Sequence, residues 1–171
     1  MRRLLLVLPL ALGLLALTAT SASAATVSGA CTVSGSADFT PNGLQATPQS
    51  LFYTFDGTGT CSGTLDGTPI TNAPVSAFAT GGGTLSCAGA LSLGGIGHIT
   101  FPNQGVTINF GINLVGVGSE VEFALTGNSG GAGAGHASFA SNADRALECN
   151  NPTGVNDLGF EIQAAAANLT G

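Results

Sequence analysis

The chain is poor in charged residues, above all in basic ones. Its 171 residues include three basic side chains, none of them Lys, against nine Asp and Glu, so the formal net charge is −6. Nucleic-acid binding needs many Lys and Arg side chains to displace counterions from phosphates, and a P-loop needs a Lys. The composition therefore excludes nucleic acid as a partner and a P-loop as the functional site.

Long apolar runs are equally scarce. The one long run, Leu4 to Leu17, follows a pair of arginines and precedes the small residues Ala22-Ser23-Ala24. This order is typical of a secretory signal peptide with its cleavage site. We expect residues 1–24 to be a signal peptide and residues 25–171 to be one secreted, extracellular domain. No later run approaches the ~20 residues of a membrane span, so we expect no transmembrane segment after cleavage.

The four cysteines lack the close pairing of a zinc site. Cys31, Cys61, Cys87 and Cys149 stand 26 to 62 residues apart, with no Cys-x-x-Cys among them. An even number of widely spaced cysteines in an exported chain indicates disulfides. We therefore expect two disulfide bonds, and neither a metal nor a cofactor.

The chain does have a regular alternation of apolar or small residues with polar ones, with a period of two. Odd positions from Val27 to Phe39 and from Leu51 to Leu65 are mostly apolar or small, with Ser, Thr and Asp between them. This pattern predicts antiparallel strands with one dry and one wet face. If the two runs form a hairpin whose paired positions sum to 92, Phe39 faces Tyr53 and Cys31 faces Cys61. Four cysteines allow three pairings, of which this register favours Cys31–Cys61 and hence Cys87–Cys149.

Turn signals divide the next part of the chain. Asp66-Gly67 predicts a tight hairpin that points even positions such as Ile70 inward. Further along, the apolar residues fall on odd positions such as Val75, which predicts a bulge near residues 72–74. Gly81-Gly82-Gly83 predicts a second turn that sets Ala77 against Cys87. We expect a fourth strand over residues 84–93 and a loop over residues 94–103, which would hold His98 and Phe101.

The last third predicts further strands. A turn at Val117-Gly118 would pair Leu114 with Val121 and Ile112 with Phe123. We expect a glycine-rich loop at 128–135, a short strand at 137–140, one helical turn at 143–148 and a final strand at 158–166. The fold class is therefore all-β: a single antiparallel β-sandwich or flattened β-barrel of about eight short strands.

Two pairs of side chains are candidates for chemistry. Glu120 and Glu122 alternate with Val121 and Phe123, so they would point to the same side of a strand, as the two carboxyl groups of a glycosidase do. A solvated strand face gives the same pattern, and the chain has no Trp and one Tyr to form a sugar platform. His98 and His136 are the only histidines, and neither has a second His at ligand spacing.

The candidate residues favour a protein that is not an enzyme, with no catalytic residue assigned. The first hypothesis is a secreted, non-enzymatic β domain that acts as a cell-surface or extracellular interaction or structural module. The second is a carrier of a small apolar ligand, since inward Gly and Ala leave room between strands. A wide cavity lined by Phe would favour the carrier, and a close-packed interior the interaction module. The third is a glycosidase-like hydrolase that uses Glu120 and Glu122.

Overall fold

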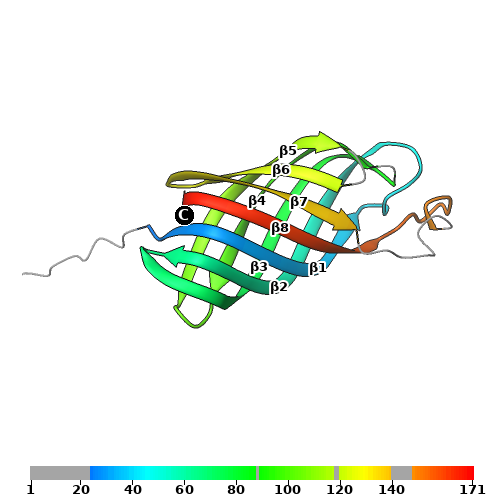
Figure 1. The fold of residues 1–171 in the computed structure, drawn as a ribbon. Coiled ribbons are helices and arrows are strands. Elements are labelled where there is room, and N and C mark those ends of the chain that lie inside the picture. Colours follow the sequence, from blue (N-terminus) through cyan, green and yellow to red (C-terminus); the bar gives the residue numbers. More distant parts are fainter. Residues whose placement is uncertain (1–23, 88, 118–119, 140–147) are drawn as a thin grey trace, which may run out of the picture.

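The protein folds as a closed antiparallel β-barrel, seen in a computed structural model that describes residues 24–87, 89–117, 120–139 and 148–171 (Figure 1). Each strand pairs with its neighbours in the chain, and the last pairs with the first. The strands are β1 (Thr26–Thr40), β2 (Gln49–Leu65), β3 (Thr68–Ser86), β4 (Gly89–Phe101), β5 (Val106–Val117), β6 (Glu120–Gly127), β7 (Gly130–Phe139) and β8 (Asp157–Thr170). The all-β prediction is confirmed, and of its two architectures the barrel is correct.

The predicted pairing of β1 with β2 is confirmed residue by residue. Phe39 faces Tyr53 and Cys31 faces Cys61. Both predicted disulfides form, Cys31–Cys61 with 4.1 Å and Cys87–Cys149 with 6.1 Å between Cα atoms. Two disulfides fit an extracellular location, because oxidising compartments let them persist.

The predicted bulge is also present, at the edge of the predicted range. The register between β2 and β3 shifts between Cys61, which faces Ala73, and Gly63, which faces Ile70. Asn72 takes a φ of 47°, and its backbone N–H donates to Ser62 Oγ at 2.9 Å. The extra residue lets β3 keep its apolar side inward on both sides of the bulge.

Two loops predicted from glycines are wrong. Gly81 to Gly83 lie inside β3, and residues 94–101, His98 included, lie inside β4. The predicted pair of Ala77 and Cys87 is replaced by Ala77 opposite Ile99. The glycines are needed because the two backbones approach closely, so that a Cβ on Gly81 or Gly83 would overlap the backbone of β4. Phe101, predicted in the loop, is fully buried at the end of β4.

Further differences concern length and register. The hairpin of β5 and β6 exists, but Ile112 faces Leu125 and Leu114 faces Phe123, two residues away from the predicted register. Its turn residues 118–119 lie outside the described part of the chain. β7 starts at Gly130 rather than at 137, so the predicted loop is mostly strand. β8 is longer than predicted, and the helical turn predicted at 143–148 falls almost entirely outside the described residues.

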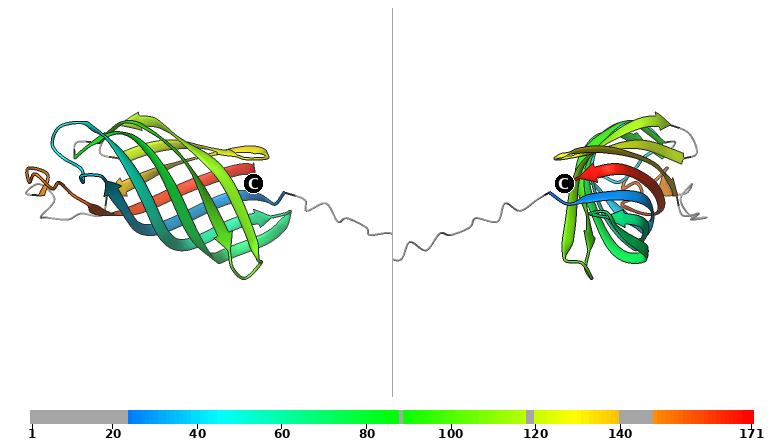
Figure 2. Two further views of the ribbon diagram at one scale, coloured as in Figure 1. Left: turned by 180° about the vertical axis from the view of Figure 1, so that it is seen from behind. Right: turned by 60° about the vertical axis from the view of Figure 1, so that its left-hand side comes forward.

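The two ends of the barrel differ. One end holds the start of β1, the end of β8 and short turns, and the other holds the loop 41–48 and the segment 148–156, which lie side by side (Figures 1 and 2). Leu44 and Val155 exchange two backbone hydrogen bonds of 2.8 and 2.9 Å, and the N–H of Ala46 donates to the carbonyl of Cys149. Because Cys149 is bonded to Cys87 after β3, these segments form a covalently anchored lid.

Candidate functional site

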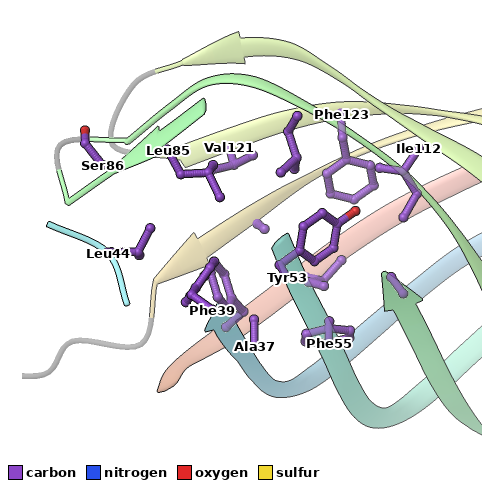
Figure 3. A pocket seen from close by; sticks show the side chains of 15 residues that line it. Ala37, Phe39, Leu44, Tyr53, Phe55, Leu85, Ser86, Ile112, Val121 and Phe123 are labelled. Carbon is purple, nitrogen blue, oxygen red and sulfur yellow. The ribbon is translucent and has the colours of Figure 1, made fainter. Parts of the chain in front are cut away.

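An apolar cavity lies inside the barrel beneath this lid. Its volume is about 130 Å³, and every strand contributes to its wall (Figure 3). None of the lining residues that the structure describes is charged. The fifteen residues around it are Ala37, Phe39, Leu44, Tyr53, Phe55, Ala79, Leu85, Ser86, Leu93, Ile112, Val121, Phe123, Ala137, Phe160 and Ile162.

A second apolar hollow of about 100 Å³ continues further into the barrel. On β1 its lining is Cys31 and Val33, whereas the first cavity is lined there by Ala37 and Phe39, so the two follow one another along the barrel. They share five lining residues: Phe55, Ala79, Ile112, Phe123 and Ile162. The interior therefore holds two apolar hollows in succession, and the five shared side chains lie between them.

The space exists because many inward positions carry Gly or Ala, while a few aromatic rings lie over the glycines. Phe123 faces Gly135 across β6 and β7, and a Cβ on Gly135 would stand 2.7 Å from the end of the Phe123 ring. Gly97 and Phe110 have the same relationship across β4 and β5, at 2.8 Å. A ring that lies over a glycine covers the wall without filling the centre, whereas the branched side chains typical of small barrels would fill it.

The cavity has one polar group that stands apart. Tyr53 points inward from β2 with 7% of its surface exposed, and its hydroxyl is directed toward Ile112 and Phe123 (Figure 3). Among the described residues, this hydroxyl is the only buried side-chain oxygen or nitrogen without a hydrogen-bond partner. Leaving a buried hydroxyl unpaired costs roughly 1–3 kcal/mol, and burial raises the pKa of Tyr53 to about 12.

The sequence did not single out Tyr53. Period-two alternation correctly predicted its place on the inner face opposite Phe39, but gave it no role beyond the core. Two signals were present. Tyr53 is the only Tyr of the chain, and it faces Gly81 of β3, which in turn faces Gly95 of β4. The second signal can be seen only with the correct register of β3 with β4. The turn predicted at residues 81–83 implied a different register, so Gly95 was not placed beside Gly81.

The residues considered for hydrolysis lie elsewhere. Glu120 and Glu122 are both on β6, opposite Ser138 and His136 of β7. The side chain of Glu122 is exposed, and neither interior hollow is lined by it. The hydrolase hypothesis thus stays a prediction that rests on the spacing alone.

The two histidines do not come together. His98 is on β4 and His136 on β7, and the two strands β5 and β6 lie between them in the barrel wall. Within the described residues, no group of three or more His, Cys, Asp or Glu is placed to hold a metal ion.

His98 instead belongs to an open groove on the outer face of β1 to β4. Its ring stacks on that of Phe78, with 5.3 Å between ring centroids and 24° between planes. The rest of the groove is formed mainly by small polar side chains and one carboxylate: Ser34, Ser36, Asp56, Thr58 and Ser76. This groove is exposed to solvent, so it offers surface contacts but no apolar enclosure.

Comparison with known proteins gives no relative from which to transfer a role: no family model, curated protein or solved structure matches the chain. In the part of the chain that the structure describes, no helix has the length and apolar character needed to cross a membrane. Function must therefore be argued from the geometry of the barrel itself.

Proposed function

We propose that this protein is a secreted, non-enzymatic carrier of a small, uncharged, apolar molecule, which it holds inside the barrel. The observation that carries the proposal is the apolar cavity beneath the lid, to whose wall all eight strands contribute. Binding sites for small molecules are concave, mostly apolar and largely preformed, and the mouth of a β-barrel is one of their usual places. Export is supported by the signal-like N-terminus and by the two disulfides.

The size of the cavity limits the ligand. An enclosed cavity of about 150 Å³ lined by Leu, Ile and Phe stays dry and binds benzene, and this cavity of about 130 Å³ has a similar lining. A ligand that buries roughly 200 Å² of apolar surface gains about 5 kcal/mol, which corresponds to a Kd on the order of 0.1–1 mM. A longer ligand that also enters the second hollow would bind more tightly.

The lid explains how such a ligand would be kept. Leu44 lines the cavity and is buried against the segment that carries Val155. Since the eight strands form a closed wall, a ligand would enter at an end of the barrel, and the lid is the end nearer the cavity. The lid is held by scattered backbone hydrogen bonds and one disulfide and not by a continuous strand ladder, so its opening costs less free energy than the opening of the wall.

The experiment is a titration with toluene, followed by the NMR amide shifts of residues around the cavity. Ala137→Leu adds three carbon atoms to the inner face of β7 and is expected to weaken toluene binding at least tenfold. The matched control, Ala134→Leu, makes the same change at an exposed position of β7 and should leave binding unchanged. Toluene that bound equally to both variants, or not at all to the unaltered protein, would contradict the carrier function.

A second candidate function is that of an extracellular interaction module. The observation in its favour is the pair of large apolar side chains exposed on the outer face of β2 and β4, Phe52 at 69% and Ile96 at 66%, on the same face as the stacked Phe78 and His98; this set is called the outer patch. Exposed apolar patches often mark contact surfaces. If copies of the chain associate through this patch, Phe52→Ser combined with Ile96→Ser will lower the sedimentation coefficient at high concentration. An unchanged coefficient argues against self-association.

A further inference from the structure

We infer that the ligand is an uncharged molecule that carries one hydrogen-bond acceptor, best supplied by a ketone or aldehyde oxygen, and that the hydroxyl of Tyr53 donates to it. This inference rests on the proposed carrier function and adds the chemical class of the ligand. It starts from the hydroxyl that has no partner within the protein.

The position of the hydroxyl explains why no protein group satisfies it. Tyr53 faces Gly81, which in turn faces Gly95, so the side chain extends along a row of glycines inside the wall. Its oxygen ends 2.5 Å from where a Cβ of Gly95 would stand and is directed toward Ile112 and Phe123 (Figure 3). The lining offers little else that is polar, since Ser86 is the only other polar side chain of the fifteen.

A water molecule is a poor partner for this hydroxyl. An ordered internal water needs two to four polar partners, and most of the backbone groups of the wall are occupied by the strand pairing. A water molecule beside Tyr53 would therefore make one hydrogen bond in the cavity and lose the several hydrogen bonds that it makes in bulk water. A carbonyl oxygen on an otherwise apolar ligand needs only one donor. The Tyr53 hydroxyl lies against the wall with almost no surface open to the empty cavity, so it meets such an oxygen when the ring shifts inward.

The uncharged lining further limits the class of ligand. A carboxylate or an ammonium group would lose its hydration in this cavity without an opposite charge among the described lining residues, none of which is charged. Burial keeps Tyr53 protonated, since its pKa is raised to about 12, and so preserves its ability to donate. Fatty acids and amines are therefore expected to bind far more weakly than neutral ketones of the same size.

The test compares two probes of the same shape, cyclohexanone and methylenecyclohexane, in the unaltered protein and in Tyr53→Phe. The ratio of their two Kd values is taken in each protein, because the cost of removing the ketone from water is common to both and cancels. We expect the ratio to shift by about tenfold in favour of the hydrocarbon when the hydroxyl is removed.

A spectroscopic readout makes the test independent of how well the variant folds. The infrared carbonyl stretch of bound cyclohexanone should move to lower frequency in the unaltered protein relative to the ketone in an alkane solvent, since a hydrogen bond weakens the C=O bond. An unshifted carbonyl band, or an unchanged ratio while both probes bind, overturns the inference but leaves the carrier function standing. If neither probe nor toluene binds, the carrier function itself is wrong.

Discussion

The hydroxyl oxygen of Tyr53, on β2, lies 2.5 Å from the point where a Cβ atom would stand on Gly95, two strands away on β4. No residue other than glycine fits at position 95 without displacing the tyrosine. The Tyr53 hydroxyl therefore lies against the bare backbone of β4. This relationship also means that the cavity depends on glycine as much as on the aromatic residues that line it.

We expect Gly95→Ala to lower the free energy of unfolding by about 1–3 kcal/mol, because the added methyl group meets both the Tyr53 hydroxyl and the backbone of β3. The neighbouring Gly94→Ala is the matched control, since its Cβ would find nothing nearer than 3.9 Å. Urea denaturation of the two variants measures the difference. Equal loss of stability in both would show that backbone freedom, and not the contact with Tyr53, matters at this position.

Tyr53→Phe should stabilise the protein in the absence of ligand. The change removes a buried hydroxyl that has no partner and keeps the ring, so the free energy of unfolding should rise by about 1 kcal/mol. Phe55→Tyr, which adds a hydroxyl to the same cavity, should have the opposite effect. Both are measured by chemical denaturation, and a clear loss of stability in Tyr53→Phe would mean that the hydroxyl is already satisfied.

The ionisation of Tyr53 should occur at unusually high pH. Burial raises its pKa from 10.0 to about 12, and the chain has no other Tyr and no Trp, so the phenolate absorbance reports this side chain alone. Between these two values the unfolded chain loses the phenolic proton while the folded one keeps it. Stability contributed by this group is therefore complete below pH 10 and is lost as the pH rises toward 12.

That titration has an internal control. After unfolding in denaturant, the same absorbance should titrate with the ordinary pKa of a tyrosine, close to 10. Identical titrations in the folded and unfolded protein would mean that water reaches the hydroxyl.

The two disulfides should have separable effects. Replacing Cys87 and Cys149 by Ala removes the anchor of the lid, so a bound probe should exchange with solvent at least several-fold faster, as NMR exchange spectroscopy would show. Replacing Cys31 and Cys61 by Ala affects the wall between β1 and β2, and should lower stability by roughly 2–4 kcal/mol with a smaller effect on exchange. Faster exchange in the wall variant alone would place the entrance between those strands.

Alternation and cysteine placement were sufficient to predict the first hairpin. Period-two alternation predicted which face of β1 and β2 is buried, and setting Cys31 opposite Cys61 selected the register that the structure has. The bulge at Asn72 followed from the conflict between the Asp66-Gly67 turn and the later phase of β3. These predictions succeed because a strand allows only two faces, and a turn or a disulfide then leaves one register.

By itself, the sequence determined that the chain is all-β and which face of its first strands is dry, and it favoured, among three possible pairings, the two disulfides that the structure shows. The tertiary structure alone decided that the sheet closes through β1 and β8, that Gly81 to Gly83 continue a strand, and that Tyr53 ends unpaired in a cavity. The reason is that the local sequence around a glycine looks the same whether the glycine lies in a turn or in a strand. Only the backbone that packs against it, here β4 against Gly81 and Gly83, makes the strand the favourable state.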